Sequence, residues 1–540
     1  MKTKRLLSVL TLAVLLPYTA LAEEWQDPIT KVNYETMGSS NGYYAIVVKS
    51  PKATGDITIR STITINGYQY PVTYIWTQAF DDNNNITSVT IPGSIIGIDP
   101  AFRGCSNLKE VTIQEGVTYI GTGAFMNCSS LTQVTIPKSV TDIGNTAFAN
   151  CSSLTSVTIP EGITRIESWT FQGCSSLKEV VIPSTMTFIG GYVFANCSSL
   201  ESVTIPETVT FIADYAFSGC SSLTEVTIPG SVTDIRPSTF EGCSGLTEVI
   251  IQEGVTSIGK KAFSGCSGLT KVTIPEGVTT IGEYAFAYSF YNNNSSSCYN
   301  LTQITIPSSM TSISNTAFSE CSGLTSIIVE SGNTVYDSRD NCNAIIETAS
   351  NTLFLGCQNT VIPLSITSIG DYAFGGCTSL TEVTIPSSVT SIGNSAFRGC
   401  TSLTEVTIPS NVTSIGNSAF YNCRGLTSVT SLIQEPFIID PGVFWILSEQ
   451  EYLSGSFTTA TLYVPKGTKE KYKATAGWKE FTNIVEMEDD DPTNVEAITN
   501  HSENMVTERY ALGGQRVSGQ QRSLNIERMS DGTIKKVMVR

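Results

Sequence analysis

The sequence is poor in the residues that enzymes use for acid–base and metal chemistry. It contains a single histidine, His501, among 540 residues. A Ser-His-Asp or Cys-His catalytic arrangement would have to use this histidine, which lies in a polar segment outside the regular part of the chain. The sequence has no C-x-x-C pair of the kind that holds zinc, no P-loop, and no G-x-G-x-x-G after a strand in a βαβ pattern. We therefore expect no catalytic residue, no cofactor and no metal site.

Charged residues are scarce, and most of them are acidic. They make up 15% of the chain and leave a net charge of −17. Binding to nucleic acid depends on Lys and Arg that neutralise phosphates, and attraction to anionic membrane surfaces needs the same residues. The composition therefore argues against both kinds of partner. Hydrophobic residues make up 41%, which favours a well-packed chain over a disordered one.

Long apolar runs are also missing, except at the N-terminus. Three basic residues precede an apolar stretch over 6–16, and the small-x-small triplet Ala-Leu-Ala follows at 20–22. This pattern is typical of a secretory signal peptide, which we assign to residues 1–22. No later segment is long and apolar enough to span a bilayer, so we expect no transmembrane segment in the mature chain.

What the sequence does contain is a repeat of 23 residues, as in LTQVTIPKSVTDIGNTAFANCSS at 131–153. Leu131, Val134 and Ile136 match the L-x-x-L-x-L strand of a leucine-rich repeat, and Pro137 ends that strand. A cysteine follows three residues after most of the regularly spaced phenylalanines. The phenylalanines at this spacing are Phe102, Phe125, Phe148, Phe171, Phe194, Phe217, Phe240, Phe263 and Phe286.

One such turn cannot bury its own apolar face, whereas stacked turns bury each other. We count about fifteen turns, which at a strand spacing of about 4.8 Å give a rod on the order of 70 Å long. The fold class that we predict is a right-handed leucine-rich-repeat solenoid with a β-rich concave face and β-type caps. The solenoid should cover residues 81–430.

Two insertions interrupt the period within this array. The segment 287–299 is rich in Tyr and Asn and adds nine residues to one turn. The segment 331–358 has the pattern of a β-hairpin-like excursion. Insertions of this kind form loops that either belong to a binding face or are simply tolerated at the surface.

The ends of the array differ from its middle, as expected of caps. Residues 23–80 alternate Ile and polar residues around Asn66-Gly67, a strong type I′ turn signal, and predict a β-hairpin cap with a partial first repeat. Residues 431–486 predict a C-terminal cap with one strand and a short helix. An acidic linker at 487–500 follows. Large aromatic residues available to seal the last turn are Tyr472, Trp478 and Phe481.

The 15 cysteines leave two interpretations open. Neighbouring turns would place their Cα atoms about 5 Å apart, which is within reach of a disulfide. Equivalent side chains in stacked turns point the same way, however, and each fills a position in the core. We favour a column of buried, reduced thiols.

The outward positions of the repeated strand are the candidate binding face. Extended repeat surfaces commonly bind large partners, although Thr is also simply a good strand residue and the recurring Glu residues also keep a rod soluble. Paired carboxylates of a glycosidase are a further, less favoured reading of the Glu residues. The candidates are Glu110, Gln133, Thr135, Glu179, Thr204, Glu225, Thr227, Glu248 and Lys271, together with Tyr288 and Tyr291 of the first insertion.

The repeat, with its VTIP, IG, AF and C marks, closely resembles the BspA-like leucine-rich-repeat surface proteins of Gram-negative anaerobes. The resemblance covers residues 80–430, and LYVPKGTKEKYKATAGWKEF resembles the segment that closes such arrays. It implies a secreted or surface-anchored, adhesin-like, non-enzymatic protein that binds host extracellular-matrix or cell-surface proteins or glycans. We expect a monomer.

The tail at 501–540 resembles the C-terminal sorting domain that the type IX secretion system reads. Tyr510, Leu512, Gly514 and Val517 fit its start. The alternative is an ordinary small β-unit without an export role. The residues that fit the closing strands are Leu524, Ile526, Asp531, Gly532, Lys535, Lys536 and Val537.

Two other functions remain open from the sequence. The rod could be a structural spacer at the cell surface without a specific ligand. It could also present a flat Thr array to an ordered lattice such as ice, although the strand carries mostly one outward Thr beside a variable position.

Overall fold

The computed structural model describes residues 23–39, 42–287, 297–447, 455–488, 506–511, 524–529 and 534–538. The chain forms a β-solenoid of about 18 turns of roughly 23 residues, which confirms the predicted fold class. The number of turns exceeds our count because segments near both ends of the array also form turns. The chain divides into two compact units, one reaching to Val361 and including Gly370–Leu380, the other formed by Ile362–Ile369 and the residues from Thr381 onward.

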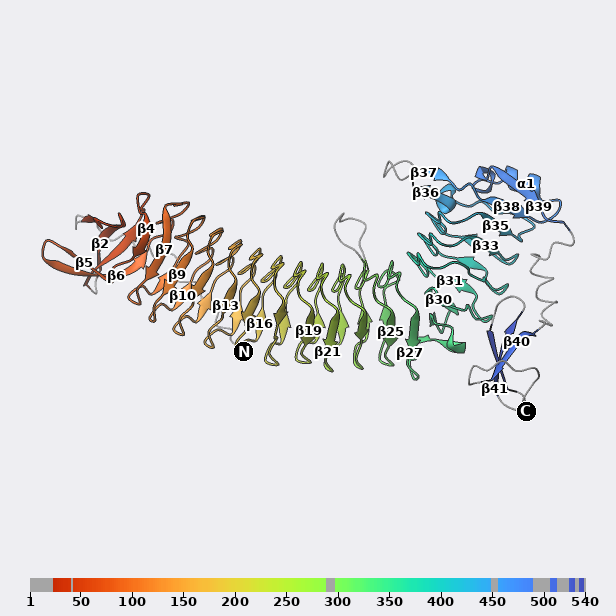
Figure 1. Cartoon of the computed structure of the whole chain (residues 1–540), viewed down its shortest axis with the longest axis horizontal. Coiled ribbons are helices and arrows are strands. Elements are labelled where there is room, and N and C mark those ends of the chain that lie inside the picture. The colour runs from red at the N-terminus through yellow and green to blue at the C-terminus, as the bar shows by residue number, and fades with distance from the viewer. Residues whose placement is uncertain are drawn as a thin grey trace. The chain divides into compact units, whose positions relative to one another are not determined.

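Each turn of the first unit contributes one longer and one shorter parallel strand (Figure 1). Val and Ile at alternate positions of the longer strand point inward and are buried, while the residues between them, mostly Glu, Gln, Ser or Thr, point outward. The outward residues of these strands form the long-strand face. The longer strands are β7 (Ile86–Ile91), β9 (Glu110–Ile113), β11 (Gln133–Thr135), β13 (Ser156–Thr158), β15 (Glu179–Val181), β17 (Ser202–Val203), β19 (Glu225–Ile228), β21 (Glu248–Ile251), β23 (Lys271–Thr273), β25 (Gln303–Ile306) and β27 (Ser326–Val329).

The shorter strands contain two residues each, of which the second is a buried Ile and the first points outward except for the buried Gly97 of β8. They pair in parallel from turn to turn and form the short-strand face. They are β8 (Gly97–Ile98), β10 (Tyr119–Ile120), β12 (Asp142–Ile143), β14 (Arg165–Ile166), β16 (Phe188–Ile189), β18 (Phe211–Ile212), β20 (Asp234–Ile235), β22 (Ser257–Ile258), β24 (Thr280–Ile281) and β26 (Ser312–Ile313).

The repeated phenylalanines form one continuous column in the core of this unit. From Phe80 to Phe318, successive rings lie 4.8–5.7 Å apart and within 19° of parallel. All of these side chains are buried. The ring spacing is close to that of paired strands, so each turn adds one ring to the stack.

The residue before each repeated cysteine has a left-handed backbone conformation, with φ between 60° and 78° over eight successive turns from Gly104 to Gly265. Only Gly, and with less ease Asn, adopts this conformation without steric cost. The sequence has Gly or Asn at all eight positions. The N-C and G-C pairs of these turns therefore suit the backbone conformation, although Glu320 also has a φ of 62° before Cys321.

All fifteen cysteines are buried free thiols, so the structure agrees with the reduced column rather than with disulfides. The thiol of Cys105 donates to the carbonyl oxygen of Phe80 at 3.1 Å, and that of Cys266 donates in the same way to Phe240 at 3.3 Å. Burial raises the pKa of Cys174 and of Cys243 to about 12. The thiols are therefore protonated core groups at neutral pH.

Threonine hydroxyls also link the turns. The side chains of Thr132, Thr155 and Thr247 each donate to the backbone carbonyl of the residue 23 positions earlier, at 3.0–3.3 Å. A second ladder passes through Thr187 and Thr256 at 3.0 Å. Many exposed Thr residues therefore stabilise the stacking of turns, a role that the sequence analysis did not anticipate.

The N-terminal residues extend both sides of the array. The antiparallel strands β1 (Glu24–Gln26), β2 (Asn33–Ser39) and β3 (Gly42–Val48) were not anticipated from the sequence. Strand β4 (Gly55–Thr58) pairs in parallel with β7. Strands β5 (Thr62–Ile65) and β6 (Tyr68–Ile75) form a hairpin with Asn66 and Gly67 at its turn, at φ 52° and 83°.

The second unit continues the same repeat. Its strands β31 (Ser368–Ile369), β32 (Ser391–Ile392) and β34 (Ser414–Ile415) pair in parallel, as do β33 (Glu405–Ile408), β35 (Ser428–Ser431), β38 (Thr461–Val464) and β39 (Asn483–Glu486). Strands β36 (Trp445–Leu447) and β37 (Gly455–Phe457) form an antiparallel pair. Its helices are η2 (Pro441–Phe444), α1 (Lys469–Ala474) and η3 (Trp478–Glu480).

Aromatic side chains cover the end of this second array. Phe444 continues the stack of Phe397 and Phe420, and its ring contacts Phe481 at 5.1 Å. Trp478 is fully buried and donates to the carbonyl of Phe437 at 2.9 Å.

The backbone of β40 (Val506–Ala511), β41 (Leu524–Met529) and β42 (Ile534–Met538) forms an antiparallel sheet. The export role of this tail stays a prediction.

Candidate binding face

Strand register aligns the predicted residues of the long-strand face in two columns. In the first column Glu110 lies beside Gln133, and Glu179 lies between Ser156 and Ser202. The run Glu225, Glu248, Lys271, Gln303 and Ser326 continues it over five turns. All the predicted strand residues of this column are exposed.

The second column consists mainly of threonine but contains three exposed aliphatic residues. Thr135 is exposed, Thr227 is half-buried, and Thr204 is exposed one residue beyond the end of β17. Val181, Ile250 and Ile328 are 46%, 51% and 44% exposed. Ile250 lies between Thr227 and Thr273 in the register.

We call the group around Ile250 the Ile250 patch: Glu225, Thr227, Glu248, Ile250, Lys271 and Thr273. Its centre is aliphatic, and charges of both signs lie beside it on neighbouring strands. Among the ion pairs of the described part of the chain, none uses Glu225, Glu248 or Lys271. These charged side chains are therefore free to pair with groups of a partner.

Two of the predicted site residues, Tyr288 and Tyr291, lie outside the described residues. The chain on either side of them keeps the regular positions of the repeat. Ala287 and Cys298 are both buried, and Cys298 donates its N–H to the carbonyl of Phe286 at 3.1 Å. The insertion therefore begins and ends at core positions of one turn.

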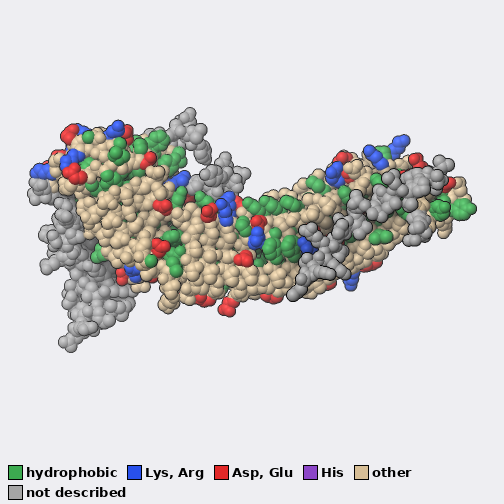
Figure 2. All heavy atoms as spheres, turned by 180° about the vertical axis from the view of Figure 1, so that it is seen from behind, with side chains coloured by type: hydrophobic (Ala, Val, Ile, Leu, Met, Phe, Trp, Pro, Cys, Tyr) green, Lys and Arg blue, Asp and Glu red, His purple; other side chains and the backbone are tan. Residues whose placement is uncertain are grey.

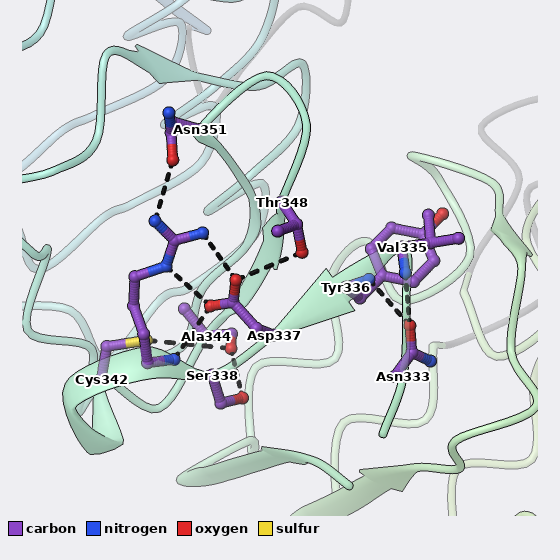
Figure 3. A network of polar contacts seen from close by, with 10 residues as sticks. Asn333, Val335, Tyr336, Asp337, Ser338, Cys342, Ala344, Thr348 and Asn351 are labelled. Atoms are coloured by element: carbon purple, nitrogen blue, oxygen red, sulfur yellow. Dashed lines mark hydrogen bonds and ion pairs between the residues drawn. The ribbon is translucent and has the colours of Figure 1, made fainter. Parts of the chain in front are cut away.

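The second insertion folds as a small antiparallel element with strands β28 (Tyr336–Asp337), β29 (Ile345–Glu347) and β30 (Thr352–Leu355), and with the short helix η1 (Arg339–Asn341). The guanidinium of Arg339 donates to Asp337 at 2.6 and 2.8 Å and to the side-chain oxygen of Asn351 at 2.8 Å (Figure 3). Burial opposes ionisation of Asp337, but these hydrogen bonds hold its pKa below the ordinary value. The insertion is thus a structured element.

Its base is tied to the neighbouring turns by Asn333. The side-chain oxygen of Asn333 accepts the N–H groups of Val335 and Tyr336 at 2.9 and 2.8 Å. Its amide donates to the carbonyls of Pro307 and Met310. Ser338 donates to the carbonyl of Ala344 at 2.7 Å and so closes the loop around η1.

The sequence analysis missed an aromatic group on the short-strand face. Trp169, Tyr192 and Tyr215 stack in three successive turns, and Phe188 stacks on Phe211. The signal was present in the sequence, since the residue two before the core phenylalanine is aromatic in these turns. These aromatic residues lie outside the strand with the L-x-x-L-x-L pattern, from which the candidate binding face was predicted.

Most of the visible surface carries neither charge nor large apolar groups (Figure 2). Within the described ranges, no group of three or more His, Cys, Asp or Glu side chains is placed to hold a metal ion. In the same part of the chain, none of the helices has the length and apolar character to cross a membrane.

Comparison with known proteins places the repeat in a family. The chain matches the BspA type Leucine rich repeat region in six copies, over residues 73–201, 170–293, 290–350 and 347–444. No curated protein sequence matches it. A leucine-rich repeat protein from Bacteroides ovatus is a structural relative at 22% identity and a TM-score of 0.50, with 86% of this chain and 100% of that chain covered.

Two further structures align over most of the chain with lower scores. A leucine rich cell surface protein from Faecalibacterium prausnitzii is 23% identical, with a TM-score of 0.27 over 87% of this chain and 96% of its own. The pneumococcal vaccine antigen PcpA is 15% identical, with a TM-score of 0.29 over 86% and 99%. Since the family matches span well over half of the chain and the turns have the family's period, this protein belongs to the BspA-type leucine-rich-repeat family of bacterial surface proteins.

Proposed function

We propose that this protein is an adhesin-like surface protein that binds a host extracellular-matrix or cell-surface protein or glycan through its long-strand face. The observation that supports this most is the Ile250 patch. Interface centres combine exposed apolar groups with a polar rim, and the patch has this composition on a strand surface that other side chains leave open. Leucine-rich-repeat solenoids are typically non-enzymatic scaffolds for protein interactions, and we propose no catalytic role.

The proposed location rests on the two terminal segments. Residues 1–22 have the pattern of a signal peptide, and 501–540 resemble a type IX sorting tail. Removal of the tail should leave the protein in the periplasm of a host that has this secretion system. Surface protease accessibility of the full-length and truncated chains would test the proposal, and equal surface exposure of both would refute the sorting role.

The binding proposal is tested with the mature chain on an array of extracellular-matrix proteins and glycans at physiological salt. Saturable binding to one class is expected. The double variant Glu248→Lys and Ile250→Lys should weaken it at least tenfold, because it reverses one charge and introduces another in the centre of the patch.

Glu405→Lys is the matched control, because Glu405 has the equivalent strand position in β33 of the second unit. The control should bind as the unaltered chain does. Equal binding by the double variant and the control would refute the Ile250 patch as the site. Absence of any binding by the folded chain would favour the structural spacer, which the near-identical stacked turns also suit.

A further inference from the structure

Five aromatic side chains, which we call the aromatic patch, lie on the short strands and in the turns that directly follow them: Trp169, Phe188, Tyr192, Phe211 and Tyr215. Trp169 and Tyr192 lie 5.7 Å apart and within 11° of parallel, and Tyr192 and Tyr215 lie 4.6 Å apart and within 6°. Phe188 and Phe211, the outward residues of β16 and β18, stack at 5.2 Å. Three successive turns thus carry two stacks of aromatic rings.

The backbone does not require aromatic residues at three of these positions. Trp169, Tyr192 and Tyr215 have φ values of 60°, 56° and 60°, a left-handed conformation that bulky side chains adopt at a steric cost. The same position holds Gly123 at φ 67° and Ser238 at φ 56° in other turns. Thr146 and Lys261 share this conformation, so the position accepts many side chains, and three successive aromatic residues there are not a requirement of the backbone.

The three-ring stack is exposed at its Trp169 end. The position before Trp169 in the column is Thr146, so within the described part of the chain no ring of this column lies over the outer face of Trp169, whereas the other end is followed by the buried Ser238. Trp169 remains 41% exposed although its other face is stacked on Tyr192. An indole face of this kind attracts groups that present polarised C–H or N–H bonds.

The charged groups around the patch are paired with one another. Arg165 pairs with Glu167 and Arg236 pairs with Asp214, both at 2.6 Å. The guanidinium of Arg165 lies over the ring of Phe188 at 4.7 Å, and that of Arg236 lies over Phe211 at 5.2 Å. The rim is therefore balanced in charge and favours an uncharged ligand over a polyanion or a polycation.

The exposed area of the patch limits the size of its ligand. Phe211 is 37% exposed, and the other rings except Trp169 are less so. Since large aromatic side chains present about 150–250 Å² each, the whole patch offers on the order of 300–400 Å². A specific protein interface takes about 800 Å² from each partner. The patch suits a ligand of a few rings.

We infer that the aromatic patch binds a neutral oligosaccharide. The C–H face of one pyranose ring packs against the open face of Trp169, above Thr146, and the paired charged groups at the rim serve the sugar hydroxyls as hydrogen-bond donors and acceptors. This site lies on a different sheet from the Ile250 patch. The inference therefore does not depend on the proposed function, and either one can fail alone.

The test is isothermal titration of the mature chain with cellohexaose and with chitohexaose at millimolar concentration. We expect saturable binding of at least one of them. Trp169→Gly should weaken it tenfold or more while the chain stays folded, because glycine accepts the local φ without strain. Trp76→Phe, which changes another exposed tryptophan, should bind as the unaltered chain does.

A second variant keeps the test decisive if Trp169→Gly unfolds. Thr146→Lys leaves every ring in place but puts an ammonium group over the open face of Trp169, and Lys261 shows that the repeat accepts lysine at this position. It should also abolish binding. Absence of binding by either oligosaccharide, or unchanged binding by Thr146→Lys, would overturn the inference. If the double variant Glu248→Lys and Ile250→Lys loses oligosaccharide binding and Thr146→Lys keeps it, the binding site lies on the long-strand face and the inference is wrong.

Discussion

Removal of one ring from the phenylalanine column should destabilise the array locally and severely. Phe171 is fully buried and stacks on Phe148 at 5.5 Å and on Phe194 at 5.7 Å, with rings within 3° of parallel. Its backbone carbonyl accepts the thiol of Cys197 at 3.3 Å. Phe171→Ala therefore leaves a ring-sized cavity between two rings that cannot close it.

The expected cost is about 3–5 kcal/mol, the range for Phe→Ala in a packed core. Because each turn contacts only its neighbours, this cost should be concentrated in the adjoining turns. Hydrogen exchange followed by mass spectrometry measures it segment by segment. Protection should fall over β11, β13 and β15 and stay unchanged over β33 and β35 of the second unit.

Lys178→Ala is the control, because Lys178 is exposed in the next turn and its ion pair with Glu201 is long, at 4.0 Å. It should change the free energy of unfolding by less than about 0.5 kcal/mol. A cost below about 1 kcal/mol for Phe171→Ala, or a loss of protection spread evenly over both units, would refute the column as the source of stability.

Three other predictions follow from local contacts. Asn150→Ala should lower the free energy of unfolding by about 1–2 kcal/mol, because Asn150 has a left-handed backbone with a φ of 60°. Asn150→Gly should leave the free energy of unfolding nearly unchanged. Urea unfolding measures both, and equal effects of the two variants would contradict the backbone argument. The buried thiols should resist a thiol reagent near neutral pH until the chain is unfolded. Burial raises the pKa of Cys174 to about 12 in the folded chain, from an ordinary 9.0. The stability that Cys174 contributes is therefore present below pH 9 and should fall as the pH rises from 9.0 towards 12. A free energy of unfolding that increases with pH over this window would contradict the burial of the column. Arg339→Ala should reduce amide protection in β28 and β29 and leave the Ile250 patch unaffected, because the guanidinium of Arg339 donates to Asp337 and Asn351 within the insertion. Unchanged amide protection in β28 and β29 would show that other contacts hold the insertion.

The repeat made the fold of the array predictable, but it gave no information about segments that occur only once. Val134 and Ile136 identify the strand, and the 23-residue step of Phe148 and Phe171 identifies the stacking, because one turn's contacts recur in the next. The sheet β1–β2–β3 could not be derived this way, since its strands occur once. Its pairing depends on contacts between segments that share no pattern.

The candidate face was predictable only as far as period-two alternation fixes it. Glu248 and Lys271 could be placed outward from the sequence, and register shows that they are neighbours. The aromatic patch was missed because Trp169 and Phe188 come from different parts of two turns. Trp169 also has a left-handed backbone, which the sequence pattern does not reveal.

The direction of the hydrogen bonds between turns has a mechanical consequence. In the first unit these bonds run along the direction in which turns stack, so under tension along that direction every interface between turns carries the same force, and the interfaces break one at a time rather than all together. A turn that detaches releases 23 residues, which extend to roughly 75–80 Å. A tethered chain under flow would lengthen stepwise, dissipating work at each turn while the turns beyond it kept their structure.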